Sequence, residues 1–559
     1  MPDETAVQEN AAPADARPWK PGLLLVLILG LFYGALQNGL WVPVSDGDAY
    51  LAIARNLATG KGFVFNGFVV EAMPPGWPFF LAGAMKISGS FLFLNLLPMA
   101  LMLIALLLFY RLLLRLTTPG RALAVCLVTG ILSHVYHRTF MLHSEALFCV
   151  IATAALLLAL QVNEGRRATW RIPLLLILCV FSVVVRWAGV LMIPVVAAAL
   201  LNGRRRLRLD RFWATAVIAG ILMLGTFFAL RMELKEIEPG APAPKDAGSY
   251  ATRPHTLVGR VMKGPRRLLS SGRWYAGLLA EPLHLGMSLK PVAVAGNLAG
   301  WGLIALFVLG MIPFLRERNW LLLGAFLYTL GVVVLWTKPV PRYFVPVAPF
   351  LLLGLWNGLD RLARAPDSKA RRRIGKALLI ALVAGTALGN LSLYAVDVWM
   401  IHSRDFYANY QAGNAEALIN VAHVINTHAP LDATIARDHN ELAFVDRSPS
   451  RSRLFDLRGL HLLTNRIIMT APDELEGDGP DEAHVAWATE KGARFYIHRP
   501  PVSPWQVWHF RAPWLQEWVT GEPVGEPNPL YELYELKDGE AVRVRIPDVD
   551  HPIRTVPHL

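Results

Sequence analysis

The chain has 559 residues, of which 54% are hydrophobic and only 17% are charged, and its mean hydropathy is +0.39. Soluble domains carry about 25% charged residues, so this composition excludes a simple soluble protein, a disordered chain and a fibre. The formal net charge of +12 would suit a nucleic-acid partner, but the basic residues cluster between long apolar runs, as in the cytoplasmic loops of membrane proteins. We therefore expect a polytopic membrane protein that binds no nucleic acid.

Long apolar runs recur along the chain as far as residue 400. A bilayer core of about 30 Å requires about 20 apolar residues in a helix, and the sequence contains about eleven such runs. We expect spans at residues 22–42, 91–114, 122–140, 146–162, 172–185, 187–201, 212–232, 292–315, 320–336, 343–359 and 377–400. The first run is too long for the apolar part of a signal peptide and is expected to stay as an anchor. The runs at 172–185 and 187–201 are short, and they could also form one kinked span.

The distribution of Lys and Arg predicts the orientation of these spans. Every alternate short loop is basic, beginning with Arg111, Arg115 and Arg121 after the second span. These loops and the N-terminal tail, residues 1–21, are expected in the cytoplasm, and the alternation holds only if 172–185 and 187–201 are separate spans. Residues 22–400 then form the membrane part, and three larger segments lie outside it, at 43–90, 233–291 and 401–559.

The outer segments differ in kind. Basic and apolar residues mix with helical spacing near 257–273, which indicates an amphipathic helix on the membrane surface within 233–291. The segment 401–559 has the composition of a small soluble α/β domain. Its expected elements are helices at 415–426 and 482–491, strands at 433–437 and 493–498, and a hairpin of 530–536 with 541–546. A tryptophan-rich stretch at 505–518 suits contact with sugars or lipid headgroups, and equally suits packing against the membrane face.

Charged residues from distant parts of the chain gather at the predicted outer face. Charges at membrane level are costly, so they are functional hypotheses by default. Arginine and lysine bind phosphate by charge-assisted hydrogen bonds, and carboxylates take protons from hydroxyl groups. Together they indicate chemistry on a lipid phosphate; the alternative is a set of snorkelling or paired interfacial charges. The residues are Asp46, Asp48, Arg138, His143, Glu145, Arg186, Lys338 and Arg342.

The first outer loop carries the most distinctive pattern. It reads Ser-Asp-Gly-Asp-Ala-Tyr at 45–50, Ala-Arg-Asn-Leu at 54–57, Gly-Lys-Gly at 60–62 and Met-Pro-Pro-Gly-Trp-Pro at 73–78. Later pieces agree with it, namely His-Ser-Glu-Ala-Leu-Phe at 143–148, Arg-Tyr-Phe-Val-Pro at 342–346 and Glu-Lys-Gly-Ala-Arg-Phe-Tyr-Ile at 490–497. The whole resembles the polytopic glycosyltransferases of the GT-C class, and within that class the bacterial branch related to protein O-mannosyltransferases and lipid A aminoarabinose transferases.

This resemblance implies a GT-C-like α-helical polytopic fold and an inverting glycosyltransferase. The donor would be a polyprenyl-phosphate-linked sugar, and the acceptor would be a glycan, a lipid or a protein on the outer face of a bacterial inner membrane. The C-terminal domain would then be periplasmic. Two other classes stay open: a polymerase or ligase of lipid-linked glycans, and a non-enzymatic flippase or transporter of such lipids. A transporter would be expected to show Gly- or Pro-broken spans in matching halves, which the sequence lacks.

Many relatives in this class carry adjacent Asp-Glu after the first span, whereas Gly47 separates Asp46 from Asp48 here. Asp48, which precedes Ala-Tyr and the Ala-Arg-Asn-Leu helix, is the better match for the catalytic acid, and Asp46 is the alternative. The expected roles are catalytic base for Asp48 and Asp46, donor-phosphate binding for Arg342, Arg186, Arg138 and Lys338 in that order, and orientation of the acceptor or a cation for Glu145 and Tyr50. Glu145 could instead cap the N-terminus of the fourth span.

No set of metal ligands is evident in the sequence, although a divalent cation is left open as a cofactor. Cys126, Cys149 and Cys179 all lie inside apolar runs, so we expect them to be packing residues rather than disulfide partners. His134 and His137 are expected to pack in the membrane or at its interface, because two histidines alone rarely form a metal site.

Overall fold

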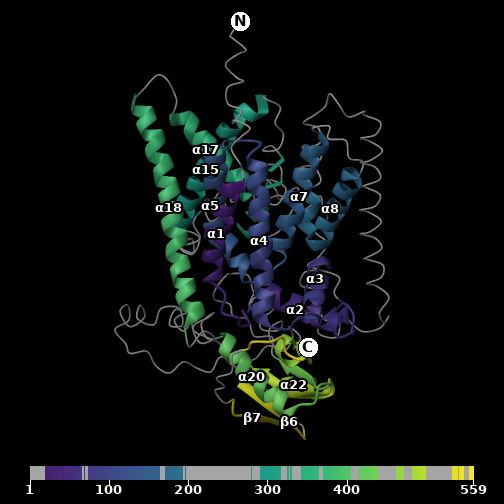
Figure 1. Cartoon of the computed structure of the whole chain (residues 1–559). Coiled ribbons are helices and arrows are strands. Elements are labelled where there is room, and N and C mark those ends of the chain that lie inside the picture. The colour runs from purple at the N-terminus through teal and green to yellow at the C-terminus, as the bar shows by residue number, and fades with distance from the viewer. Residues whose placement is uncertain are drawn as a thin grey trace, which may run out of the picture.

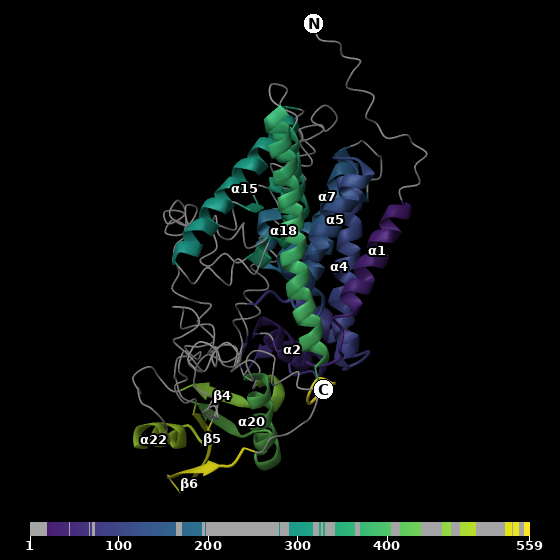
Figure 2. The same cartoon turned by 90° about the vertical axis from the view of Figure 1, so that its left-hand side faces the viewer.

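The computed structural model describes residues 19–43, 45–65, 68–69, 73–163, 170–192, 196, 279, 290–316, 324–325, 328–329, 341–363, 369–403, 414–437, 461–470, 481–498, 532–538, 540–546 and 553–559. Within these ranges, helices form an elongated bundle, and a β-sheet with its own helices lies beyond one end of that bundle (Figures 1 and 2). We call the end of the bundle next to the sheet the sheet end, and the opposite end the distal end.

The bundle consists of long apolar helices. Those described are α1 (Trp19–Gly34), α4 (Phe91–Leu113), α5 (Pro119–Ile131), α7 (Glu145–Asn163), α8 (Arg171–Val185), α15 (Lys290–Arg316), α17 (Ala348–Ala363) and α18 (Lys369–His402). Several are apolar on every face, as expected for helices that contact only lipid and other helices. Glycines bring α15 and α17 together: a Cβ added to Gly310 would lie 1.9 Å from the carbonyl oxygen of Gly354. Small residues at such an interface let two membrane helices approach closely.

Four helices in the described part of the chain are long and apolar enough to cross a membrane, at Phe91–Leu113, Glu145–Val162, Arg342–Leu362 and Gly375–His402. Shorter apolar helices cover Lys20–Gly34, Arg171–Val185 and Gly296–Ile312. The chain is therefore a membrane protein, and these helices fall on predicted spans. The span predicted at 212–232 lies outside the described residues, as does much of 187–201 and 320–336. The total of about eleven spans stays a prediction.

The third predicted span, 122–140, is bent rather than straight. After α5, the short helices α6 (Ser133–Tyr136) and η2 (His137–Thr139) continue at an angle of 71°. Polar side chains of α18 explain the bend. Asn390 Oδ1 accepts a hydrogen bond from the backbone N–H of Ser133 at 2.7 Å. The Asp397 carboxylate accepts from the Tyr136 hydroxyl at 2.7 Å and contacts His137 Nε2 at 2.9 Å. His137 therefore has a charged partner, where the sequence predicted simple packing.

Two short helices, α2 (Ser45–Ala58) and α3 (Gly76–Met85), lie across the sheet end of the bundle (Figure 1). Between them, β1 (Val64–Phe65) pairs antiparallel with β2 (Phe68–Val69). Every residue of α2 from Gly47 to Asn56 is buried. α3 packs directly on the end of α8, since a Cβ added to Gly76 would lie 2.8 Å from a methyl carbon of Val185. The first outer loop is thus part of the core rather than a surface loop.

The C-terminal segment forms a five-stranded mixed sheet in the order β4-β3-β5-β6-β7. Its strands are β3 (Thr434–Arg437), β4 (Ile467–Thr470), β5 (Ala493–His498), β6 (Glu532–Lys537) and β7 (Glu540–Val544), and its helices include α20 (Asn414–His428) and α22 (Glu482–Glu490). β3 is parallel to β4 and β5, and the last two strands are antiparallel. The helices, strands and hairpin predicted here are confirmed, whereas β4 was missed. The stretch 505–518 lies outside the described residues, as does 233–291 apart from Leu279 and the start of α15.

Residues 553–559, which we call the C-terminal strap, return from the sheet to the first outer loop. The backbone N–H groups of Trp41 and Phe91 donate to the carbonyl oxygens of Ile553 and Arg554, each at 2.8 Å. From α2, the buried Arg55 donates to the carbonyl of Leu462 at 2.6 Å and to Asn465 Oδ1 at 2.7 Å. Burial lowers the pKa of Arg55 to about 10, so it stays charged. These contacts fix the sheet and α2 to each other.

Candidate active site

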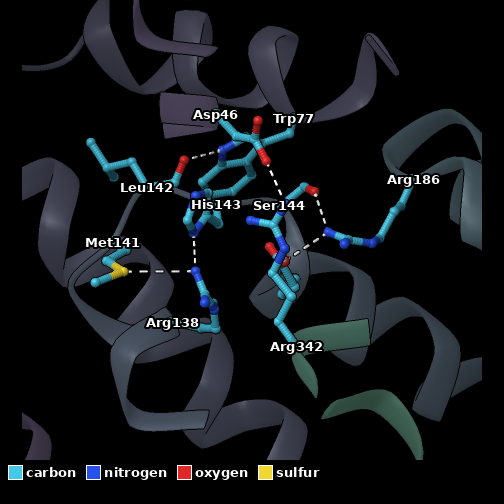
Figure 3. Close-up of polar contacts among 10 residues, drawn as sticks. Asp46, Trp77, Arg138, Met141, Leu142, His143, Ser144, Arg186 and Arg342 are labelled. Carbon is cyan, nitrogen blue, oxygen red and sulfur yellow. Dashed lines mark hydrogen bonds and ion pairs between the residues drawn. The ribbon is translucent and has the colours of Figure 1, made fainter. Parts of the chain in front are cut away.

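Charged side chains from four separate parts of the chain meet beside α2. Figure 3 shows Asp46, Ser144, Arg186 and Arg342 pointing toward one another. Asp46 lies in the first turn of α2, Glu145 begins α7, Arg186 follows α8, and Arg342 lies in η6 (Pro341–Val347). Because the spans between them are long, only the folded bundle brings these residues together. We call Asp46, Glu145, Arg186 and Arg342 the charged cluster.

Ion pairs between its arginines and carboxylates hold the charged cluster together. Arg342 Nη2 lies 2.7 Å from Asp46 Oδ2, and Arg186 Nη1 lies 3.0 Å from Glu145 Oε1. Arg342 Nε lies 3.8 Å from the same oxygen of Glu145. The side chain of Glu145 is only 2% exposed, whereas those of Asp46 and Arg342 are 20% and 25% exposed. Glu145 is therefore an internal counter-ion for both arginines, and Asp46 and Arg342 are the most exposed members of the cluster.

The two guanidinium groups also share an aromatic neighbour. The Cζ atoms of Arg186 and Arg342 lie 4.9 and 5.5 Å from the centre of the Tyr343 ring, within the range of a cation–π contact. Arg186 donates a further hydrogen bond to the Ser144 hydroxyl at 3.2 Å. Burial disfavours its charged form, but the carboxylate of Glu145 outweighs this and raises the pKa of Arg186 above its ordinary value. Two cations are thus held side by side at the end of the bundle.

The two acids of α2 have opposite environments. Residues two apart in a helix do not face the same way, and only Asp46 points to the arginines. Asp48 is fully buried, and its Oδ1 accepts a hydrogen bond from the indole N–H of Trp41 at 2.9 Å. The structure therefore brings Asp46 to the cluster, while Asp48, the better match by sequence, is held by Trp41 near the end of the first predicted span.

Tyr50 lies next to the cluster. Burial, followed by the negative charge of Asp46, raises the pKa of its hydroxyl above the ordinary value. The side chain of Tyr50 is 8% exposed, and the hydroxyl stays protonated as a hydrogen-bonding group. The orienting role of Tyr50 stays a prediction.

Arg138 lies beside His143. Its Nη1 contacts Nδ1 of His143 and lies 3.7 Å from the sulfur of Met141 (Figure 3). Burial, and then the charge of Arg138, lower the pKa of His143 to about 3, so this imidazole is neutral. The indole N–H of Trp77 donates to the carbonyl of Leu142 at 3.0 Å and fixes the same segment. Lys338, the fourth predicted phosphate ligand, lies outside the described residues.

Sequence reasoning assigned no role to Trp41, Ser144 or Tyr343. Ser144 and Tyr343 each adjoin a predicted charged residue within the motifs at 143–148 and 342–346, so the motifs themselves held the signal. Trp41 stands seven positions before Asp48, and no short-range pattern links an indole at the end of a span to that carboxylate.

No group of three or more His, Cys, Asp or Glu residues that could hold a metal ion occurs among the residues that the structure describes. Both carboxylates of the charged cluster have arginine partners at 2.7 and 3.0 Å. His134 and all three cysteines are buried, in agreement with their predicted packing roles.

No protein-family model and no curated protein sequence matches the chain. Several solved structures match the chain in fold. The structure of ArnT from Cupriavidus metallidurans bound to undecaprenyl phosphate matches with a TM-score of 0.53 and 14% identity over 94% of this chain and 98% of that chain. The archaeal oligosaccharyltransferase AglB from Archaeoglobus fulgidus, in complex with an inhibitory peptide and a dolichol-phosphate, matches with a TM-score of 0.49 and 12% identity over 86% of this chain and 69% of that chain. The predicted resemblance to the GT-C class is thus confirmed for the fold.

Proposed function

We propose that the chain is an inverting glycosyltransferase that moves a sugar from a polyprenyl-phosphate donor to an acceptor glycan, lipid or protein. The observation that carries this proposal is the charged cluster, in which two arginines and two carboxylates from distant segments meet at one end of a membrane bundle. The fold likeness to ArnT, which was crystallised with undecaprenyl phosphate, supports the donor class. The site would face the outside of a bacterial inner membrane, with the N-terminus in the cytoplasm.

Arg342 and Arg186 are the proposed ligands of the donor phosphate. Arginine can bind phosphate through two parallel hydrogen bonds, which fixes orientation as well as charge. When the bond between the anomeric carbon and the phosphate oxygen breaks, negative charge grows on the departing polyprenyl phosphate. Cations already held in place stabilise that charge in the transition state. Glu145, between the two arginines at 3.0 and 3.8 Å, keeps them in place while the site is empty of donor.

Asp46 is the proposed catalytic base. Its carboxylate accepts the proton of an acceptor hydroxyl, the hydroxyl oxygen bonds to the anomeric carbon from the face opposite the phosphate, and the configuration inverts. In the absence of donor, Arg342 Nη2 is paired with Asp46 Oδ2 at 2.7 Å. A donor phosphate competes for the same guanidinium, so its arrival releases the carboxylate for the acceptor. Asp48 then supports the loop through Trp41, and Tyr50 orients the acceptor.

The experiment is transfer of a labelled sugar from polyprenyl phosphate in proteoliposomes that contain the purified chain. Asp46→Asn should lower the rate about a hundredfold to ten-thousandfold, which is the usual cost of losing a general base. The matched control is Asp360→Asn, because Asp360 also pairs with an arginine, Arg121 at 2.5 Å, and its side chain is similarly exposed, 22% against 20%. Asp360 lies away from the charged cluster, so this variant should transfer normally.

The same proteoliposomes distinguish the proposed transferase from a flippase and from a polymerase or ligase. A flippase would move the labelled lipid across the bilayer in both variants and form no glycosidic product. A polymerase or ligase whose functional residues lie elsewhere would keep its activity in Asp46→Asn. Normal transfer in Asp46→Asn and Asp48→Asn alike would remove the first outer loop from catalysis and with it the mechanism proposed above.

A further inference from the structure

A cavity lies at the distal end of the bundle, away from the charged cluster. It has a volume of about 680 Å³ and is formed by α1, α4, α7 and α8. Small and apolar residues such as Gly22, Leu107, Ala154 and Leu178 line it, and Arg111 and Arg115 stand at one end. These residues come from the parts of α1 and α4 that Figure 1 shows farthest from the sheet. Cavities of about 300–1,000 Å³ are the usual size for sites that hold small ligands.

The cavity changes from apolar to cationic along one face of α4. Leu107, Leu108, Arg111, Leu114 and Arg115 all line it. Residues three and four apart share a helix face, so these side chains form one continuous strip. Leu107 and Leu108 lie one turn before Arg111, toward the middle of the bundle, and Leu114 and Arg115 follow just past the end of α4. Both arginines are exposed. A strip of this kind matches a molecule with a hydrocarbon tail and an anionic head.

We propose that this cavity binds one anionic phospholipid, with an acyl chain against the leucines of α4 and the phosphate on Arg111 and Arg115. Guanidinium groups bind phosphate oxygens by charge-assisted hydrogen bonds, and basic residues just inside the membrane surface attract anionic lipids. The site is separate from the proposed donor site, because Arg342 and Asp46 lie at the sheet end. The inference does not depend on the proposed glycosyltransferase activity.

The competing explanation is that Arg111 and Arg115 only reach toward the headgroup layer, as long cationic side chains near helix ends do. The structure offers a matched control for this. Arg373 and Lys376 are also exposed cations near the end of a membrane helix, α18, but they do not line the cavity. General attraction to headgroups would act on both pairs alike, whereas a site acts only on the first pair.

Native mass spectrometry of the full chain in detergent micelles tests the proposal. The micelles contain equimolar phosphatidylglycerol, phosphatidylcholine and undecaprenyl phosphate, which differ in mass. The wild-type chain should retain one phosphatidylglycerol in preference to phosphatidylcholine. Arg111→Gln with Arg115→Gln should weaken this binding about tenfold or more, the effect of losing a charge-assisted hydrogen bond. Arg373→Gln with Lys376→Gln should leave it unchanged.

A third variant, Ala154→Phe, fills the apolar part and leaves both arginines in place. It should also reduce retention of phosphatidylglycerol. Equal binding of phosphatidylglycerol and phosphatidylcholine by the wild-type chain would overturn the proposal, as would equal loss in the two double variants. Retention of undecaprenyl phosphate that is lost in Arg111→Gln with Arg115→Gln would overturn it as well, because the occupant of this cavity would then be the carrier lipid of the donor.

Discussion

The two ends of the bundle use arginine in different ways. At the sheet end, Arg186 and Arg342 have side chains 12% and 25% exposed and are paired with carboxylates from other segments. At the distal end, Arg111 lies in the last turn of α4 and Arg115 just after it, and both side chains are exposed. Taking a charge out of water is costly unless a partner compensates it, so the first arrangement requires several segments to supply charges together. On this comparison, the exposure of a charge and its ion-pair partners would distinguish the proposed reaction centre from the proposed headgroup contact.

Among the arginines, the largest effect is expected from Arg342. Arg342→Ala should lower the transfer rate about a hundredfold or more, because a preorganised charge at the leaving phosphate is lost, and it leaves Asp46 and Glu145 without this cation. Arg342→Lys should recover part of the rate, since the positive charge remains but the bidentate hydrogen bonding to phosphate is lost. The measurement is kcat in proteoliposomes at matched protein amounts.

A control for this variant is Arg361→Ala. Arg361 also lies in a membrane helix, but it donates to a backbone carbonyl, that of Leu309 at 3.1 Å, rather than to a carboxylate. Its loss should leave kcat unchanged. Equal transfer by wild type and Arg342→Ala would instead assign the phosphate to Arg186 or Arg138.

A smaller effect is expected from Asp48→Asn than from Asp46→Asn. The amide oxygen of an asparagine can still accept the hydrogen bond from Trp41, so the loop keeps its anchor and the rate should fall about tenfold or less. Rates of the two single variants, compared at equal expression, decide the order. If Asp48→Asn were inactive and Asp46→Asn active, the catalytic base would be Asp48, the residue that the sequence favoured.

Trp41→Phe tests how far the anchor of Asp48 contributes to stability. It keeps a buried ring but removes the donor to Asp48 Oδ1, and the loss of a hydrogen bond to a buried carboxylate should cost about 1–3 kcal/mol. The readout is the thermal unfolding midpoint in detergent. Trp77→Phe is the counterpart, because its indole donates to a neutral carbonyl at 3.0 Å, and it should destabilise less. If the two variants unfold at the same temperature, the carboxylate adds nothing to the anchor.

The smallest effect concerns pH. Burial lowers the pKa of His461 to about 4 from its ordinary value near 6.5. The unfolded chain therefore binds a proton at a pH where the folded chain does not, and stability should fall as pH drops from about 6.5 toward 4. His461→Gln should reduce the dependence of the unfolding free energy on pH over this range. The exposed His423 gives the matched variant, His423→Gln, whose pH dependence should equal that of the wild type.

The sequence predicted most of the fold because its signals are local. Apolar runs placed the helices at 91–114, 146–162 and 377–400 nearly where the structure has them, and alternation across a turn placed β6 and β7. The bend at Leu132 was not predictable, because it depends on Asn390 and Asp397, which lie more than 250 positions away: Asn390 is 257 positions from Ser133.

The site was predictable as a set of residues but not as an arrangement. Charges at one membrane level identified Asp46, Glu145, Arg186 and Arg342. Which of the two acids of α2 faces the arginines depends on how that helix is rotated, and Arg55 fixes the rotation through Leu462 and Asn465. Since those contacts are far away in the sequence, the motif alone favoured Asp48.

The C-terminal strap has a consequence for biosynthesis. Arg55 donates to the carbonyl of Pro557, 502 positions later in the chain. At a translation rate of about 5–20 residues per second, α2 waits on the order of 25–100 s for this acceptor. During that interval the membrane helices can insert, but the helix that carries Asp46 lacks its final supports. The charged cluster is therefore expected to mature last, so that a nascent or truncated chain in the membrane is inserted yet inactive until the strap arrives.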